Sequence, residues 1–184
     1  MIFQVGPLSS SLRLPRPVGT LAWTLGVVAM HAAVPFQLSQ LDRRAGRRTS
    51  TPAVRGAGLV LVAAGTALMG WAFAGHYRAA EEGWQLRPWP APGYLLRGGP
   101  YRLSRNPMYA GEAVAWAGWG LVYASPAVWA GLAGLCAAFT VITRWEEQQL
   151  LRRFGEPYRA YPAEVPRWVP RGWTPPAPGG SRGR

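Results

Sequence analysis

At residues 98–111 the chain reads Gly-Gly-Pro-Tyr-Arg-Leu-Ser-Arg-Asn-Pro-Met-Tyr-Ala-Gly, a polar, basic and aromatic stretch. The next 32 residues, 112–143, carry no charge after Glu112, and the run Arg144-Trp145-Glu146-Glu147 follows them. One straight helix over 109–143 would be about 50 Å long, whereas the hydrocarbon core of a bilayer is about 30 Å thick. Pro126 lacks a backbone donor and disfavours helix in the residue before it. We therefore predict a helical hairpin of 109–123 and 126–143 that turns at 124–126.

The hairpin brings two distant polar pairs to one membrane surface, because it returns the chain to the side that it left. Taken alone, Asn106-Pro107 looks like a helix N-cap with proline at the first helical position, and Glu146-Glu147 like two solvated residues at a helix end. The convergence of the two pairs beside aromatic residues favours a ligand-binding or catalytic site over these two structural interpretations. Carboxylates suit a ribose or an amino group, Arg105 suits a carboxylate or phosphate, and tyrosines suit an adenine or a sulfonium cation.

The composition favours a membrane protein. Only 15% of the 184 residues are charged, below the quarter or so of soluble proteins, and ten Trp and seven Tyr fit residues that gather at bilayer interfaces. The net charge of +12 comes from arginines that flank apolar segments, which favours anionic lipid headgroups over nucleic acid. Cys136 is the only cysteine, so no disulfide forms within one chain, and we predict no metal site.

Two earlier apolar segments, about 18–38 and 53–75, predict further spans. Pro35 predicts a kink or an early end of the first, and His31 within it is expected to be a neutral imidazole bonded to a neighbouring helix. Glycines at 56, 58, 65 and 70 predict close helix packing in the second. With four crossings, 15 of the 20 basic residues lie on the side of residues 106 and 146, which the positive-inside tendency makes cytoplasmic.

The predicted fold class is an all-α integral membrane protein with about four transmembrane helices, including a C-terminal helical hairpin, and a cytoplasmic cofactor site. The predicted segments are 1–17, a basic lead-in; 18–75, two transmembrane helices; 76–108, the cofactor-binding segment; 109–143, the hairpin; 144–172, a helix and aromatic tail that complete the site; and 173–184, a disordered tail.

The motifs in this order resemble the integral-membrane methyltransferases, a group that contains isoprenylcysteine carboxyl methyltransferases and phospholipid N-methyltransferases. The resemblance covers roughly residues 85–170. It rests on Gly-Pro-Tyr-Arg-x-x-Arg-Asn-Pro-Met-Tyr at 99–109, the apolar hairpin, Glu-Glu at 146–147, Phe-Gly-x-x-Tyr-x-x-Tyr at 154–161 and Val-Pro-Arg at 165–167. No β-strand precedes Gly98-Gly99, so a soluble dinucleotide-binding fold is excluded.

The resemblance implies S-adenosylmethionine as the cofactor, with Glu146 binding it and Glu147 in support. The other residues that it places around the cofactor are Tyr94, Leu95, Leu96, Tyr101, Arg105, Asn106, Pro107 and Tyr109. The residues to which it gives a catalytic role are Arg105, Asn106, Arg144 and Glu147. This chain has Asn106 where the family usually has His. The family's substrate-contacting Arg falls at Ile142, and Arg144 lies two residues further on.

We therefore expect a methyltransferase of the bacterial cell (inner) membrane that acts on a lipophilic or lipid-linked acceptor. Carboxyl O-methylation is favoured, because a carboxylate is ionised at neutral pH and needs no general base. Glu112 is costly in lipid and should face the protein interior or the site. Methylation of a phospholipid amine or a small thiol is the alternative activity, and a membrane scaffold without activity is the non-enzyme alternative. The sequence leaves the acceptor and the oligomeric state open.

Overall fold

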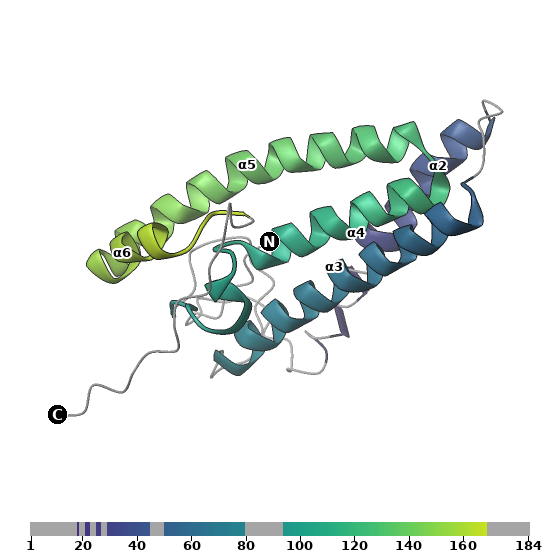
Figure 1. Ribbon diagram of the computed structural model, residues 1–184. Coiled ribbons are helices and arrows are strands. Elements are labelled where there is room, and N and C mark those ends of the chain that lie inside the picture. The colour runs from purple at the N-terminus through teal and green to yellow at the C-terminus, as the bar shows by residue number, and fades with distance from the viewer. Residues whose placement is uncertain are drawn as a thin grey trace.

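The computed structural model describes residues 18, 21–22, 25–26, 29–44, 50–79 and 94–168, and every regular element there is a helix (Figure 1). The all-helical prediction is thus confirmed. Three long helices run alongside one another, and the shortest α-helix lies at one end of the bundle (Figure 1). In chain order the elements are the π-helical turn η1 (Ala29–Ala33), α2 (Val34–Arg44), α3 (Pro52–Ala79), the 3-10 turn η2 (Gly99–Arg102), α4 (Pro107–Tyr123), α5 (Pro126–Phe154) and α6 (Glu156–Glu164).

The hairpin is present as α4 and α5, and its turn lies where the sequence predicted it. Ala124 ends α4 in the left-handed conformation, with φ at 48°. Ser125 then caps α5: its hydroxyl oxygen accepts a hydrogen bond of 3.2 Å from the Val128 amide. The same hydroxyl donates to Asp42 Oδ2 over 2.5 Å, and the Ala127 amide donates to that oxygen over 3.0 Å. A carboxylate at the end of α2 therefore caps the start of α5.

Replacement of Asp42 by alanine should lower the stability of the protein by about 1–2 kcal/mol, the usual effect of losing a helix cap. Asp42 is buried, so the Ser125 hydroxyl would lose its acceptor where water is scarce. Asp42→Asn keeps one acceptor oxygen and should retain most of the stability. Thermal unfolding in detergent measures both variants. Equal melting temperatures for Asp42→Ala and the wild type would contradict a capping role.

Glycines bring α3 and α4 into backbone contact. A Cβ atom added at Gly65 would lie 2.4 Å from the Gly111 carbonyl oxygen, and one added at Gly118 would lie 2.5 Å from the Gly58 carbonyl oxygen. Such distances leave no room for any side chain. The predicted close packing is confirmed for Gly58 and Gly65, whereas at residues 56 and 70 an added Cβ would meet nothing within 4 Å.

Of the two outcomes predicted at Pro35, a kink or an early end of the first span, the early end is wrong. The chain forms one π-helical turn, η1, directly before Val34, and α2 then continues to Arg44. Proline cannot donate to the carbonyl four residues before it, here that of His31, and a π turn is one way in which a helix accommodates an irregular hydrogen-bond ladder. The chain beyond the predicted end of the first span, at about residue 38, is consequently still helical as far as Arg44.

The second arm of the hairpin and the helix expected after it are one continuous element. Helix α5 runs for 29 residues without a break across the change from apolar to charged sequence at residue 144. Glu146 and Glu147 are therefore held by the same rigid helix that carries the apolar arm.

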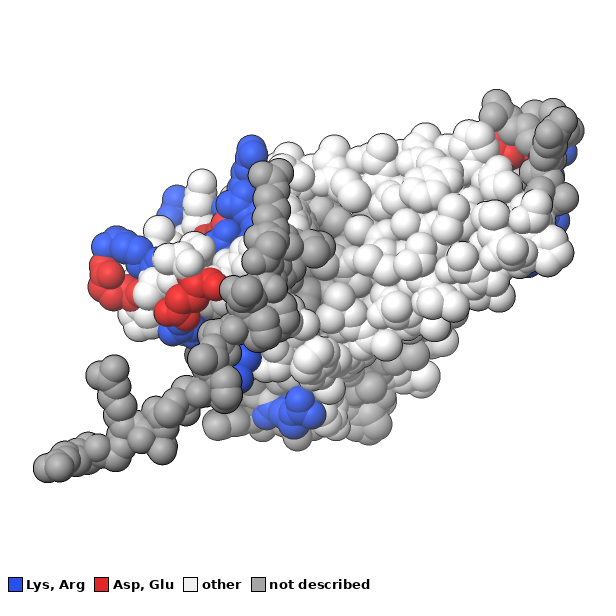
Figure 2. All heavy atoms as spheres, in the orientation of Figure 1, with Lys and Arg blue, Asp and Glu red and all other residues white. Residues whose placement is uncertain are grey.

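Two of the described helices, α3 and α5, are long and apolar enough to cross a membrane. In the most apolar 18-residue stretch of each helix, only 22% (α3) and 17% (α5) is buried inside the protein. The core helix of a soluble protein, by contrast, is mostly buried. On the face shown in Figure 2, charged side chains gather towards the two ends of the bundle, and the surface between them is uncharged. Helix α4 is apolar but has only 17 residues, and four crossings stay a prediction. The expected disordered tail at 173–184 lies outside the described residues.

Candidate active site

A hollow opens where α3 ends, α4 begins and α5 passes from apolar to charged sequence. Its empty volume is about 650 Å³, open solvent at the mouth included. Pro107, expected among the cofactor residues, is instead buried as the first residue of α4. The other nine residues expected around the cofactor all line the hollow: Tyr94, Leu95, Leu96, Tyr101, Arg105, Asn106, Tyr109, Glu146 and Glu147.

Arg144 is not among the residues that line the hollow, although the sequence analysis gave it a catalytic role. Its side chain is exposed on α5, and so is Ile142, where the family's substrate-contacting Arg falls. The helix explains the difference: residues 143, 146, 147 and 150 follow at intervals of three and four and share one face, whereas 142 and 144 point elsewhere.

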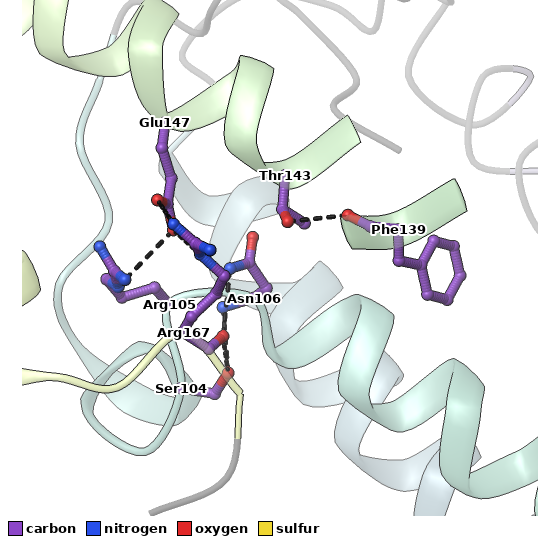
Figure 3. Close-up of polar contacts among 7 residues, drawn as sticks. All are labelled: Ser104, Arg105, Asn106, Phe139, Thr143, Glu147 and Arg167. Atoms are coloured by element: carbon purple, nitrogen blue, oxygen red, sulfur yellow. Dashed lines mark hydrogen bonds and ion pairs between the residues drawn. The ribbon is translucent and has the colours of Figure 1, made fainter. Parts of the chain in front are cut away.

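Two arginines hold the carboxylate of Glu147 (Figure 3). Arg167 binds it through two parallel contacts, Nε to Oε1 at 3.0 Å and a terminal nitrogen to Oε2 at 2.7 Å. A terminal nitrogen of Arg105 lies 3.3 Å from Oε1. This hydrogen bonding raises the pKa of Arg167, so the ion pair stays charged. Two cations and one anion leave this cluster with one positive charge in excess, and Glu146 adds a second carboxylate to the same hollow.

Asn106 occupies the N-cap position of α4, but its side chain makes no cap hydrogen bond. Its side-chain nitrogen, Nδ2, instead donates to the backbone carbonyl oxygen of Arg167 over 3.1 Å (Figure 3). The Ser104 hydroxyl donates to that same oxygen over 3.0 Å, and the Arg105 amide donates to the Pro166 carbonyl over 2.9 Å. The start of α4 is therefore tied to the segment that follows α6. The Asn106 side chain binds this segment, where the sequence suggested a helix cap.

Glu146 has different surroundings from Glu147. It is 5% exposed, and its Oε1 accepts a hydrogen bond of 2.8 Å from the Tyr109 hydroxyl. The Tyr109 ring packs on Phe139 with centroids 4.6 Å apart, which fixes the direction of that hydroxyl. The adjacent carboxylates thus have distinct roles: one is neutralised by arginines, and the other is a buried acceptor held by a tyrosine.

Tyrosines and one histidine form the wall that faces Glu146. His76 Nε2 lies 2.6 Å from the Tyr101 hydroxyl, and its Nδ1 lies 3.1 Å from the Tyr94 hydroxyl. Burial raises the pKa of Tyr94 and of Tyr158 to about 12 and that of Tyr101 higher still. These hydroxyls consequently keep their protons at neutral pH.

Four polar residues of the site were not among the predicted site residues: His76, Tyr158, Tyr161 and Arg167. Tyr158 and Tyr161 belong to the Tyr-x-x-Tyr motif and Arg167 to Val-Pro-Arg, so the motifs contained the signal. The tail within 144–172 was expected to complete the site, but the sequence did not show that it contacts residues 104–106. His76 had no sequence signal beyond its place at the end of an apolar span.

A second cavity, an apolar groove, lies along the hairpin, between α4 and α5. Its empty volume is about 830 Å³, open solvent included. Three alanines on one side of α4 leave it open, and Phe139 forms part of its α5 wall. Tyr109 lines both the groove and the hollow, so the two cavities are neighbours on either side of this residue. The residues of the groove are Tyr109, Ala110, Ala113, Val114, Ala117, Cys136, Phe139, Thr140 and Trp168.

Glu112 lies on the interior side of α4, as expected for a charged residue in an apolar helix. Its Oε1 is 3.4 Å from His31 Nε2 on the π turn η1, and each of the two side chains is 13% exposed. His31 therefore contacts a neighbouring helix, as predicted.

One comparison with known proteins gave a match. A family model described as phospholipid methyltransferase matches residues 54–157, which include the whole of α4 and the apolar and acidic parts of α5. Tyr158, Tyr161 and Arg167 lie just beyond the matched region. The comparisons with curated proteins and with solved structures gave no match.

Proposed function

We propose that the chain, which belongs to the phospholipid methyltransferase family, uses S-adenosylmethionine to methylate a lipophilic acceptor at a membrane surface. The family is one of membrane methyltransferases, and the two apolar helices agree with a membrane location. The observation that carries the proposal is the meeting of residues 94–109 with Glu146 and Glu147 around one hollow. By the positive-inside tendency, we place this hollow on the cytoplasmic side of a bacterial inner membrane.

The residues of the hollow fit the chemical groups of this cofactor. Glu146 offers a buried carboxylate to a ribose or an amino group, and Tyr94 and Tyr101 offer flat faces to an adenine or a sulfonium. The excess cation of the Arg105–Glu147–Arg167 cluster suits the carboxylate of the cofactor or of the acceptor. A buried N–H of Arg105, its Nε, has no hydrogen-bond partner in the structure and would gain one from such an oxygen.

When bound, the cofactor supplies an activated methyl group, so the protein has to hold the acceptor in line with it and to exclude water. Glu146, oriented by Tyr109, would fix the cofactor, and Glu147 would keep Arg105 in place at the wall. The resemblance also suggests Arg144 as a substrate contact, but its exposed position outside the hollow gives it no part in this arrangement.

The groove is our proposed seat for the hydrocarbon part of the acceptor. It is almost wholly apolar, it lies along the hairpin, and it shares Tyr109 with the hollow. An acceptor whose hydrocarbon chain lies in the groove would reach the methyl donor from the bilayer. We propose a carboxylate as the reacting group, because it needs no base and because the Arg105 cluster carries the excess positive charge.

A phospholipid amine is the second candidate acceptor, favoured by the family model that matches the chain. The two candidates differ in pH dependence. An amine reacts only after it loses a proton, so its methylation rate should fall as the pH is lowered through neutrality, whereas a carboxylate stays ionised down to about pH 5.

Calorimetric titration of the detergent-purified protein with S-adenosylmethionine tests the proposal. Glu146→Ala should weaken binding by roughly 10- to 100-fold, since a hydrogen bond to a charged group contributes about 1.5–3 kcal/mol. Arg105→Ala should weaken it similarly. The control is Glu164→Ala, which removes an exposed carboxylate paired with Arg97 on the outer surface. Absence of binding by folded wild-type protein would refute the proposal and leave the scaffold alternative.

A further inference from the structure

The segment that follows α6, residues 165–168, lies across the site, and we call it the strap. Its first residue, Val165, donates its amide to the Tyr161 carbonyl over 3.0 Å and packs in a buried cluster with Tyr158 and Tyr161. The strap therefore begins from a fixed point at the end of α6, sixty residues after the start of α4 that it contacts.

The middle of the strap is fastened to the rim of the hollow by two carbonyls and one side chain. The Pro166 carbonyl receives the Arg105 amide, and the Arg167 carbonyl receives both Ser104 and Asn106. The Arg167 guanidinium binds Glu147 on α5 (Figure 3). The loop before α4, the start of α4 and α5 are thus joined through two residues of the strap, Pro166 and Arg167.

The last residue of the strap reaches the other cavity. Trp168 lines the apolar groove together with Tyr109, whereas Asn106 and Glu147, which hold the preceding residue, line the hollow. The strap therefore passes from the hollow to the neighbouring groove. Its large indole ring is the one strap side chain that lines the groove.

From this arrangement we propose that Asn106 and Glu147 are positioning residues for the strap, and that Trp168 sets how far a hydrocarbon chain in the groove can pass towards the hollow. The inference rests on the proposed function, because the hydrocarbon chain is taken to belong to the methyl acceptor. It gives Asn106 a task that requires an N–H donor and no proton transfer.

Hydrogen–deuterium exchange tests the positioning role without any reaction. Asn106→Asp keeps the shape and is as good an N-cap residue, so α4 should stay intact, but it loses the N–H donor to the Arg167 carbonyl. The Arg105 amide, which donates to Pro166, should then exchange roughly tenfold faster, the effect of losing about one hydrogen bond. Glu147→Gln should act in the same direction. Arg159→Ala, which breaks an exposed pair with Glu156 on α6, is the control. Unchanged exchange in Asn106→Asp would overturn the positioning role.

Photolabelling with a twelve-carbon fatty acid that carries a terminal diazirine tests the role of Trp168. In the wild type the label should fall on the groove, in peptides that contain residues 110–117 and 136–140. In Trp168→Ala, and in Asn106→Asp, it should extend to the peptide with residues 146–150. Trp129→Ala removes another exposed indole, near the start of α5, and should leave the wild-type pattern. Trp168→Leu serves if the alanine variant does not fold.

The outcomes separate this inference from the proposed function. No groove labelling in the wild type, or the same labelling in Trp168→Ala as in the wild type, would overturn the role of Trp168. Neither readout requires methyl transfer or cofactor. Failure of S-adenosylmethionine to bind, with both readouts positive, would refute the methyltransferase and leave a strap that controls a lipid-binding groove.

Discussion

Replacement of Glu147 by alanine is expected to lower the stability of the protein by about 3–5 kcal/mol, the usual effect of removing one partner of a buried ion pair. Arg105 is 10% exposed at its side chain and Glu147 is 13% exposed, so the arginine would keep its charge where water cannot replace the lost carboxylate. For a protein of this size the melting temperature should fall by roughly 6–20 °C, at about 2–4 °C per kcal/mol. Differential scanning fluorimetry in detergent measures it.

The matched control is Glu156→Ala, which breaks a pair whose side chains are 74% and 66% exposed. Exposed pairs contribute about 0–1 kcal/mol, so its melting temperature should barely change. The double variant Glu147→Leu with Arg105→Leu should recover part of the loss, because an apolar pair can replace a buried ionic one. If Glu147→Ala melted at the temperature of Glu156→Ala, the cluster would have no structural importance.

Gly65→Ala is expected to cost about 3 kcal/mol or more, at the upper end of the range for overpacked cores. The added methyl carbon would lie 2.4 Å from the Gly111 carbonyl oxygen and 2.6 Å from the Ala115 amide nitrogen. Both are backbone atoms of α4, which cannot turn aside as a side chain does. The two helices must separate, and Asn106 and Tyr109 at the start of α4 move with them. Cofactor binding should therefore weaken together with stability.

Gly70→Ala, on the same helix, is the control for this prediction. An added Cβ there meets nothing within 4 Å, and alanine is favoured over glycine inside a helix by about 0.5–1 kcal/mol. This variant should be as stable as the wild type or slightly more so. Thermal unfolding of the two variants side by side checks the difference. A Gly65→Ala protein no less stable than Gly70→Ala would refute the backbone contact between α3 and α4.

The local sequence was sufficient to predict the helical hairpin and the part of the candidate site at Asn106 and Glu146. A charge-free run too long for a single span, broken by Pro126, allowed only a turn near residue 125, and the turn is there. The same topology brought Glu146 to Asn106. At Pro35 the sequence left a kink and an early end open, and the chain forms a π turn just before it and continues as helix.

The polar partners within the site were beyond local reasoning. The sequence treated Glu146 and Glu147 as a pair, yet helix geometry and neighbouring residues give one of them a tyrosine and the other two arginines. Arg144 looked as good a candidate as Arg167 by charge. It is exposed because its place on α5 turns it away from the face of 143, 146 and 147.

What the sequence by itself determined is the class of structure and the residues that meet: apolar length, proline position and motif order are properties of contiguous segments, and they suffice for helices, a hairpin and a shared surface. What only the tertiary structure decided is how the tail returns. The strap is held by Asn106, Ser104 and Arg105 through its backbone carbonyls, which every residue possesses and which leave no mark in the sequence. A contact made through the main chain between residues sixty positions apart can be found only once the chain is folded.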